Sequence, residues 1–352
     1  MTVKTAVIGC GPAARNQHLP ALQLNPDAKL VALCDLDAEA LRQVSMDGVA
    51  TYTDIEKLVE TESLDSVHVC TPPQTRVDIA ETVMPHDINV LFEKPLAASV
   101  SDAERLAELA AKHDVLASVV HNKLFTPHFR DAQQRVNGGD IGDVIATDVI
   151  YGSDADLTDT HRDTWVNELP GGEIGEGMPH RIYMALAFCD GLGDVECISH
   201  RNLENVDDVA FDGICIQMKD KSGNQLVTVR VLTNTISREE LTVYGTEGEL
   251  VVDNNLKSIR TSSFNDATAK GMIEESVTQA AQLMRGVVKN ALGFATRVAY
   301  RKMDDPQGEE SDSHYVLIDQ YLDAVQSGDD PPVTLAEGTD TIRVIEAIDE
   351  MI

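Results

Sequence analysis

The chain has 352 residues, of which 43% are hydrophobic and 25% are charged, ordinary values for a globular protein that exclude a disordered chain or a coiled coil. Its formal net charge is −31, which excludes nucleic acid as a favoured partner because both molecules would be negative. The length allows two domains. No apolar run reaches the ~20 residues that a membrane-spanning helix needs, so we expect a two-domain cytoplasmic protein.

The acidic residues are spread over apparent helices and loops, and Asp outnumbers Glu. Such an acidic shell is typical of proteins from a salt-rich cytosol, where molar salt screens charges beyond ~3 Å. We predict a halophilic source; an acidic protein from ordinary salinity is the alternative. The six cysteines include no CxxC pair, so we expect reduced, mostly buried thiols and no metal site or disulfide framework.

Short apolar runs alternate with amphipathic stretches over residues 1–121. The predicted strands are Lys4–Gly9, Leu30–Cys34, Ser66–Cys70, Asn89–Phe92 and Val115–Val120. The predicted helices between them are Asp37–Val44, Gln74–Met84 and Ser99–His113. This alternation is typical of a parallel sheet whose right-handed crossovers place helices on both faces. We therefore predict an α/β, doubly wound domain over residues 1–121.

The pattern changes after residue 121. A helical stretch at Pro127–Val136 precedes strand-like runs that are separated by turn residues. These runs are Ile145–Tyr151, Phe211–Lys219, Gln225–Thr233, Arg238–Gly245 and Glu249–Asp253. They predict an α+β domain over residues 122–352 with a large, mostly antiparallel open sheet. The last predicted helices, Ser313–Gln326 and Leu335–Ile352, can pack on either domain.

A glycine-rich turn joins the first predicted strand to a helix. It reads Gly9, Cys10, Gly11, Pro12, Ala13, Ala14, a GxGxxA pattern. Gly9 allows the tight turn, Gly11 leaves room for a pyrophosphate at the helix amino terminus, and Ala14 lets the helix approach the sheet. Asp35 ends the second strand, where a carboxylate accepts hydrogen bonds from ribose hydroxyls and repels a 2′-phosphate. These residues predict a Rossmann-type site that prefers NAD to NADP; a plain turn with a helix-capping Asp35 is the alternative.

Further motifs carry a family resemblance that covers nearly the whole chain. They are His18-Leu19-Pro20-Ala21-Leu22, Thr71-Pro72-Pro73, Glu93-Lys94-Pro95, Ile141-Gly142-Asp143-Val144, Gly171-Gly172 followed by Glu176 and His180, and Pro331-Pro332-Val333. The most specific is Glu93-Lys94-Pro95. With these motifs the sequence resembles the Gfo/Idh/MocA family, which includes glucose-fructose oxidoreductase and inositol dehydrogenase.

The resemblance implies a hydride transfer between nicotinamide and a sugar, polyol or nucleotide-sugar carbon. It implies that Lys94 and His180 flank the reacting hydroxyl, that Glu176 orients one of them, and that the peptide before Pro95 is cis. The other residues expected at the cofactor are Thr71, Pro72, Glu93 and Lys94. The candidates for substrate contact are Asn122, Lys123, Trp165 and Tyr183; a core or interface role is the alternative for Trp165.

Three positions depart from the family pattern. The Asp expected four residues before His180 is Glu176, and the Asp expected three residues after it is Tyr183. The His that commonly follows Thr71-Pro72 is replaced by Arg76 or lies elsewhere. We therefore expect contacts to sugar hydroxyls that differ from the family pattern. The sequence does not decide whether the substrate presents an anionic group or only hydroxyl groups to these positions.

The proposed catalytic residues suit the oxidation of an alcohol. This reaction needs a base for the hydroxyl proton, and a neutral imidazole matches that task near pH 7. Pro179 favours the first position of a helix, which would place His180 in the first turn, where the helix dipole disfavours imidazolium. Lys94 can hold the hydroxyl oxygen and stabilise developing alkoxide charge. Taken singly, Lys94 could instead be a surface cation and His180 an ordinary helix residue.

Residues 276–303 contain no acidic residue in an otherwise acidic chain. Their basic residues are Arg285, Lys289, Arg297, Arg301 and Lys302, and their apolar residues include Leu283, Val287, Val288, Leu292, Phe294 and Val298. Basic pairs at i,i+4 and an apolar side predict an amphipathic helix. We favour packing against an acidic neighbour in the same oligomer; an anionic membrane surface is the alternative.

We interpret the chain as an NAD(P)-dependent dehydrogenase of a carbohydrate CH–OH group, with NAD as its cofactor. Two alternatives stay open. One is a glycosidase that uses bound NAD catalytically and produces no net NADH. The other is a non-catalytic dinucleotide-binding regulator, whose biological activity would not need Lys94. The second domain is expected to bind substrate and to mediate oligomerisation. Because an open sheet face needs covering, we expect a homodimer or homotetramer.

Overall fold

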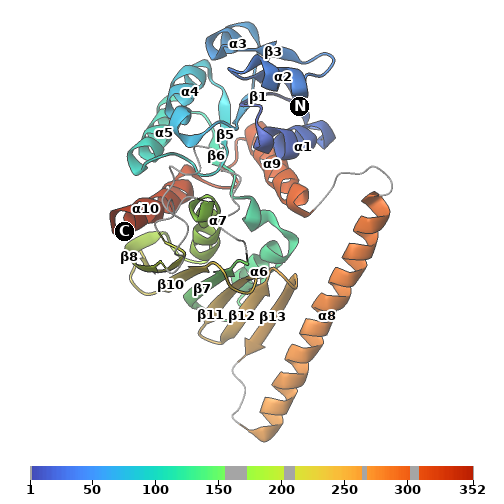
Figure 1. The fold of residues 1–352 in the computed structure, drawn as a ribbon, viewed down its shortest axis with the longest axis vertical. Helices are drawn as coiled ribbons and strands as arrows, with labels where there is room; N and C mark the ends of the chain where they lie inside the picture. Colours follow the sequence, from blue (N-terminus) through green and yellow to red (C-terminus); the bar gives the residue numbers. More distant parts are fainter. Residues whose placement is uncertain (1, 155–172, 202–210, 264–267, 302–308, 352) are drawn as a thin grey trace. The chain divides into compact units, whose positions relative to one another are not determined.

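The computed structural model describes residues 2–154, 173–201, 211–263, 268–301 and 309–351. By its internal contacts the chain divides into two compact units (Figure 1). The first unit is Met1–Phe125 with Glu309–Arg343, and the second is Thr126–Gly308 with Val344–Ile352. Most of the two C-terminal helices therefore belongs to the first unit. The sequence had left open whether these helices pack on the first or the second domain.

The first unit is built around a six-stranded parallel sheet. Its strands are β1 (Val3–Ile8), β2 (Ala28–Cys34), β3 (Ala50–Tyr52), β4 (Ser66–Val69), β5 (Asn89–Phe92) and β6 (Ala117–Val119). They lie in the order β3-β2-β1-β4-β5-β6, with every neighbouring pair parallel. The predicted doubly wound sheet is confirmed, although β3 was not predicted. The strand order reverses between β1 and β4, and open α/β sheets bind ligands beyond the carboxyl ends of strands at such a switch point.

Helices flank this sheet, with α4 and α5 on one side and α1 and α9 on the other (Figure 1). The helical segments are η1 (Ala14–His18), α1 (Leu19–Leu24), α2 (Ala38–Val44), α3 (Ile55–Thr61), η2 (Pro73–Thr75), α4 (Arg76–Val83), η3 (Met84–His86), α5 (Val100–His113), η4 (Asn122–Phe125), α9 (Glu309–Ser327) and α10 (Leu335–Met351) as far as Arg343. Ser99 caps α5, since its side chain accepts a hydrogen bond from the main-chain N of Asp102. The fully buried Tyr321 ties α9 to the sheet, because its hydroxyl lies 2.8 Å from Ser66 Oγ.

The second unit contains a seven-stranded sheet. Its strands are β7 (Val144–Gly152), β8 (Leu192–His200), β9 (Gly213–Asp220), β10 (Leu226–Leu232), β11 (Arg238–Gly245), β12 (Gly248–Asp253) and β13 (Ser258–Ser263). Their order is β13-β12-β11-β7-β10-β9-β8, and all neighbouring pairs are antiparallel except β7 with β10. The predicted mostly antiparallel sheet is confirmed, but β8 and β13 were not predicted.

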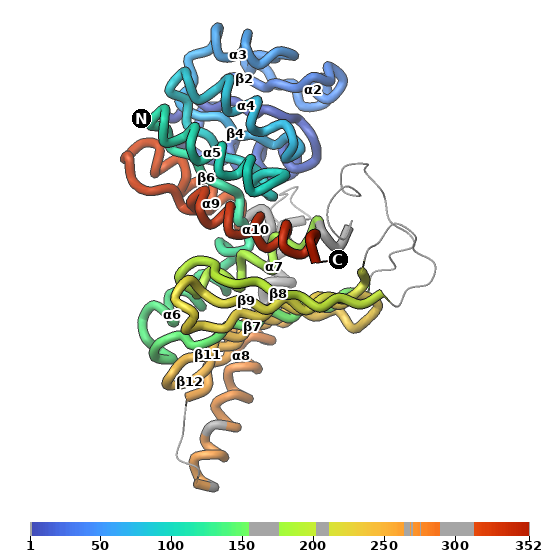
Figure 2. Tube along the Cα trace, turned by 90° about the vertical axis from the view of Figure 1, so that its left-hand side faces the viewer, coloured from blue at the N-terminus to red at the C-terminus, as the bar shows by residue number. Residues whose placement is uncertain are grey.

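The two faces of this second sheet differ. One face is apolar and buried, with Val149, Ile216 and Val229 in register on neighbouring strands. The helix α7 (Glu173–Leu186) packs on β7 and β10, and α6 (Pro127–Asn137) packs on β12 and β13. Figure 2 shows α7 and α8 (Ala269–Arg301) on opposite sides of the sheet. The apolar face thus forms the core under α7, the helix that carries His180.

Candidate functional site

The glycine-rich turn follows β1 and lies beside the carboxyl end of β4. Gly9 has a φ of +89°, a conformation that glycine adopts without strain. A Cβ on Gly9 would lie 2.8 Å from Cγ2 of Thr71 and 2.9 Å from the carbonyl carbon of Cys70, so a larger residue does not fit. At Gly11 an added Cβ would meet no atom within 4 Å. The open space over Gly11 fits a pyrophosphate that approaches the main chain.

The turn leads directly into a helix. Pro12 and Ala13 are already helical, and Ala14 is fully buried where the helix meets the sheet. The main-chain N of Arg15 donates to Gly11 O at 3.0 Å and closes the first turn. The segment η1 is a π-helix, a form that often occurs at functional sites. The first N–H groups of a helix lack intrahelical acceptors and can bind phosphate oxygens, so these residues fit the predicted dinucleotide site.

Asp35 follows β2, and its carboxylate holds two main-chain amides. Oδ2 accepts a hydrogen bond from Cys10 N at 2.6 Å, and Oδ1 accepts one from Asp37 N at 2.8 Å. A carboxylate has about four lone-pair sites, so capacity is left for ribose hydroxyls. Burial, with a contribution from the Asp35 charge, raises the pKa of the Cys10 thiol to about 11. Asp35 therefore orders the turn and is able to bind a ribose.

Arg76 is a buried cation that fastens the segment around Lys94. Its guanidinium donates to four main-chain carbonyl oxygens, those of Thr71, Glu93, Pro95 and Leu96. Burial lowers the pKa of Arg76 to about 10, so it remains charged at neutral pH. The sequence left open whether Arg76 replaces the His that family members commonly have after Thr71-Pro72. Its carbonyl contacts make it a support for the main chain, a role for which the sequence carries no signal.

Glu93 faces a buried cluster of histidines. Its Oε1 lies 3.0 Å from His18 Nε2 and 3.6 Å from His314 Nε2, and its Oε2 accepts a hydrogen bond from Lys94 N at 2.8 Å. The second nitrogen of His18, Nδ1, lies 2.9 Å from His68 Nδ1. Burial alone would raise the pKa of Glu93, but the hydrogen bonds from His18 and His314 outweigh it and hold the pKa well below its usual range. Both carboxylate oxygens of Glu93 are thus bound by groups of the protein itself. A direct contact between Glu93 and the cofactor stays a prediction.

Lys94 lies just past the carboxyl end of β5. The peptide bond between Lys94 and Pro95 is cis, as the resemblance implied, and the Lys94 side chain is partly exposed. Asn122 and Lys123 begin η4, which follows the neighbouring strand β6. Asn122 is buried, with Nδ2 3.4 Å from Ser313 Oγ, and Lys123 is partly exposed. All three predicted residues therefore lie at the edge of the sheet that carries the glycine-rich turn.

His180 lies in the interior of α7. The prediction that Pro179 begins this helix is wrong, because α7 already starts at Glu173 and Pro179 is inside it; the dipole argument for His180 therefore does not apply. An interior proline removes one helical hydrogen bond, but the buried face of α7 stabilises the helix through that position. The buried residues are Met178, Ile182, Tyr183, Met184 and Ala185. Trp165, Gly171 and Gly172 lie outside the described residues.

His180 is paired with Tyr183 on the same helix. Its Nδ1 lies 2.7 Å from the Tyr183 hydroxyl, and the two rings meet edge to face with centroids 5.5 Å apart. Glu176, His180 and Tyr183 are spaced i, i+4, i+7 and so share one face of α7. At the position where the family has an Asp, a buried tyrosine therefore orients the imidazole ring.

Arg181 anchors α7 to the sheet. Its guanidinium carbon lies 3.8 Å from the ring centre of Tyr151 on β7, and its Nη2 lies 3.4 Å from Glu239 Oε1 on β11. Its Nη1 donates to Gly177 O at 2.7 Å. A cation over an aromatic face away from water stabilises by roughly 2 kcal/mol. The residue next to His180 thus fixes the helix on the sheet, a role that the sequence did not reveal.

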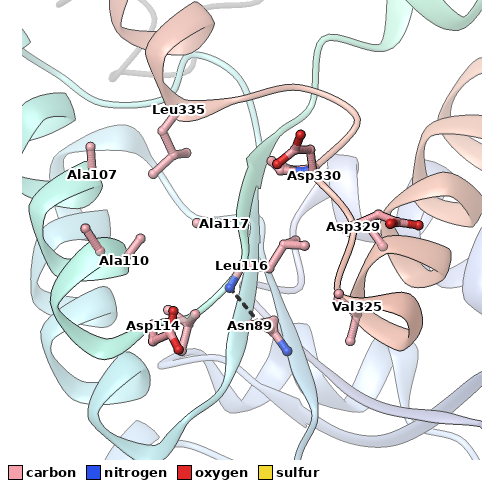
Figure 3. A pocket seen from close by; sticks show the side chains of 15 residues that line it. Asn89, Ala107, Ala110, Asp114, Leu116, Ala117, Val325, Asp329, Asp330 and Leu335 are labelled. Carbon is pink, nitrogen blue, oxygen red and sulfur yellow. Dashed lines mark hydrogen bonds between the residues drawn. The ribbon is translucent and has the colours of Figure 1, made fainter.

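A pocket of about 580 Å³ in the first unit lies at the other edge of the parallel sheet (Figure 3). It is formed at the amino ends of β5 and β6, where Asn89 Oδ1 accepts a hydrogen bond from Leu116 N at 2.8 Å. Three carboxylates line it, those of Asp114, Asp329 and Asp330. Because open α/β sheets bind their ligands at the carboxyl ends of strands, this pocket is not the dinucleotide site.

Comparison with known proteins identifies both parts of the chain. Residues 3–121 match the model of an oxidoreductase family with an NAD-binding Rossmann fold, and residues 129–251 match the GFO/IDH/MocA C-terminal domain. The WlbA dehydrogenase from Bordetella pertussis, solved with NADH and UDP-GlcNAcA, has the same fold, with a TM-score of 0.75 at 17% identity over 99% of this chain and 95% of that one.

Three curated relatives show how widely the resemblance extends. An uncharacterised protein of Saccharomyces cerevisiae is 24% identical over 71% of this chain and 74% of its own length. The myo-inositol 2-dehydrogenase of Thermotoga maritima is 30% identical over 40% of this chain and 42% of its own length. The NADP-dependent D-xylose 1-dehydrogenase of Haloarcula marismortui is 27% identical over 41% of each chain. With both domain models matched in order, the chain belongs to the Gfo/Idh/MocA family of oxidoreductases.

Proposed function

We propose that this protein is an NAD-dependent dehydrogenase that oxidises a hydroxyl carbon of a sugar, a polyol or a nucleotide sugar. The observation that carries the proposal is the grouping at one edge of the parallel sheet: open space over Gly11, acceptor capacity on Asp35, and Lys94 held at the end of β5. Bound NAD would accept the hydride. Relatives named for myo-inositol and D-xylose support this class of substrate.

The side chains take separate roles in this reaction. His180 Nε2 removes the proton of the reacting hydroxyl, while Tyr183 orients the ring through Nδ1. The Lys94 ammonium group holds the hydroxyl oxygen and stabilises the alkoxide charge that develops on it. Glu176 shares the helix face of His180 and orients the substrate or the base. Arg76 and Glu93 hold the main chain of Lys94.

Asp35 is the basis for proposing NAD in preference to NADP. Its carboxylate would lie next to the adenosine ribose, where a 2′-phosphate would be repelled. Leu36 and Asp37 follow it, in place of an Arg or Lys that would bind that phosphate. The NADP-dependent D-xylose relative makes a direct comparison of the two cofactors necessary. We expect a kcat/KM for NAD at least tenfold above that for NADP.

Absorbance at the NADH band tests the proposal. The purified chain, in ~2 M KCl to screen its charge, is offered NAD with a panel of sugars, polyols and nucleotide sugars. Accumulation of NADH with one substrate class, lost in His180→Ala and retained in the control His86→Ala, is the expected result. His86 is exposed and lies in η3. Demonstrable NAD binding without net NADH points to the redox-cycling glycosidase if a free sugar is released, and to the regulator if it is not.

A further inference from the structure

The helix α8 carries a row of exposed apolar side chains, which we call the α8 stripe. Ile273 is 64% exposed, Val277 63%, Met284 61% and Val287 43%, and Ala280 between them is also exposed. The spacing alternates between four and three residues, as at the seam of a coiled coil. The same spacing continues in the sequence with Ala291, Phe294 and Val298.

The opposite side of α8 packs on the edge strand β13. Gln282 Oε1 accepts a hydrogen bond from Thr261 N at 2.8 Å, and Gln279 Nε2 donates to Ser262 Oγ at 2.9 Å. A Cβ on Gly286 would lie 2.5 Å from the Cβ of Ser258, so helix and strand are in close contact there. At about 100° per residue, this contact side faces away from the α8 stripe. The attachment of α8 to its own sheet therefore does not use the stripe.

We propose that the α8 stripe pairs with the α8 stripe of a second copy of this chain. The 3.5-residue repeat favours a helical partner, because an ideal helix drifts ~20° per heptad from such a repeat and only a supercoiled partner follows it. Each copy carries the same stripe, so a twofold contact is self-complementary.

The charge pattern also favours a second copy. Between Ser276 and Val288 the only charged residue is Arg285, whereas the whole chain has 59 acidic and 28 basic residues. Two copies of this acidic protein can therefore approach along α8 without bringing carboxylates together. An anionic membrane would instead repel the rest of the chain, and within the described residues no helix is long and apolar enough to cross a membrane.

The α8 stripe is long enough for a specific contact. The 33 residues of α8 correspond to about 50 Å of helix. A strip about 10 Å wide along a helix of this length buries at most roughly 1,000 Å² in total over two copies, which is the size of a weak or transient interface. The pairing is thus expected to be reversible at micromolar concentrations, in addition to any contact made by the open sheet face.

Sedimentation velocity of the full chain in ~2 M KCl tests the pairing. The double variant Val277→Glu/Met284→Glu places carboxylates in the α8 stripe, and we expect it to sediment as a smaller species, with self-association weakened at least tenfold. Met272→Glu is the matched control, because Met272 is 65% exposed but lies outside the stripe. Met284→Leu keeps an apolar side chain in the stripe, so both it and Met272→Glu should assemble as the native chain does.

Two results would overturn the proposal. One is equal assembly of the native chain and the double variant, with matching circular dichroism spectra to show that both are folded. The other is a monomeric native chain that floats with vesicles of anionic lipid while the double variant does not, which would assign the stripe to a membrane. Because assembly is measured in place of turnover, the result does not depend on the proposed dehydrogenase activity.

Discussion

Two segments carry the proposed catalytic residues, and each is fixed in a different way by an arginine, which is buried in the case of Arg76 and partly buried in the case of Arg181. Arg76 supports Lys94 by binding main-chain carbonyls, which are present whatever the side chains are. Arg181 supports the helix of His180 by contacts with the side chains of Tyr151 and Glu239. The first arrangement tolerates sequence change around it, and the second depends on the identity of its neighbours.

The two segments also differ in how far they depart from the family pattern, and the departures in α7 are not at the residues that Arg181 contacts. The segment of Lys94 keeps the Glu-Lys-Pro motif, while α7 has Glu176 and Tyr183 where aspartates are expected. A reaction step shared by many dehydrogenases needs a fixed cation, whereas each substrate needs its own hydroxyl contacts. We therefore infer that Lys94 and His180 supply the chemistry common to the family and that positions 176 and 183 of α7 adapt the site to the substrate.

Removal of the cation should have the largest effect. We expect Lys94→Ala to lower kcat by ~10²–10³, the range for the loss of one donor to a developing oxyanion. Steady-state kinetics with calorimetric titration of NAD would separate lost turnover from lost cofactor binding. Lys112→Ala, an exposed lysine on α5, is the control. Near-native turnover in Lys94→Ala would contradict the assigned role.

Replacement of the two arginines compares the two supports directly. Arg76→Met leaves several buried carbonyls without a donor, and since each unsatisfied group costs ~1–3 kcal/mol, we expect a loss of at least ~3 kcal/mol in the free energy of unfolding. Arg181→Met loses one cation–π contact and one ion pair, and we expect roughly 2 kcal/mol. Urea denaturation measures both. An Arg181→Met variant that is less stable than Arg76→Met would reverse the comparison.

Acid should destabilise the first unit through its buried histidines. Burial lowers the pKa of His121 to about 3, and burial lowers the pKa of His68 well below its usual range. Both histidines stay neutral in the folded state but bind a proton near pH 6.5 in the unfolded state. Their contribution to the free energy of unfolding is therefore fully present above that pH and is lost as the pH falls below it. The slope is up to ~1.4 kcal/mol per pH unit for each histidine.

Calorimetry between pH 7 and pH 5 in ~2 M KCl would show this as a falling Tm. The variant His86→Ala should keep the same slope, because His86 is exposed. A Tm that does not change over this range would contradict the prediction, because it would mean that these histidines become protonated in the folded state without a loss of stability.

Loss of the tyrosine hydroxyl on α7 should have the smallest effect. Tyr183→Phe removes the partner of His180 Nδ1, a net change of about 1 kcal/mol, so we expect kcat to fall about fivefold. The fall should be accompanied by a changed pH profile, because the ring nitrogen has a different environment. Tyr151→Phe keeps the ring under Arg181 and should have no such effect. An unchanged profile in Tyr183→Phe would show that the hydroxyl only packs.

The parts of the fold that the sequence predicted correctly are those with strong local signals. The central strands are apolar. The glycine-rich turn needs a residue that adopts a positive φ, and Gly9 is such a residue. The strands that were missed, β3, β8 and β13, all lie at sheet edges. The strand β3 has three residues, and β8 and β13 each have one buried position, so the periodic burial that marks a strand is weak in all three. The helix boundary predicted at Pro179 was wrong. The preference of proline for the first position of a helix was outweighed by burial of the apolar face of α7, which continues the helix through Pro179.

The support around Lys94 was beyond prediction for a different reason. His314 reaches Glu93 from α9, far along the chain, and Arg76 is buried only because the main chain turns around it. In a sequence each of these residues looks like a surface charge. Their roles depend on tertiary contacts, which no local pattern records.

The hydrogen bond from Cys10 N to Asp35 limits how the cofactor preference can be engineered. A small residue at position 35 would remove the repulsion of a 2′-phosphate but would leave this amide without its acceptor, at a cost of ~1–3 kcal/mol. The glycine-rich turn, which we propose binds the pyrophosphate of the cofactor, would then loosen. A workable exchange keeps an acceptor oxygen, as Asp35→Asn does, and adds a cation at the neighbouring Leu36, which is 89% exposed.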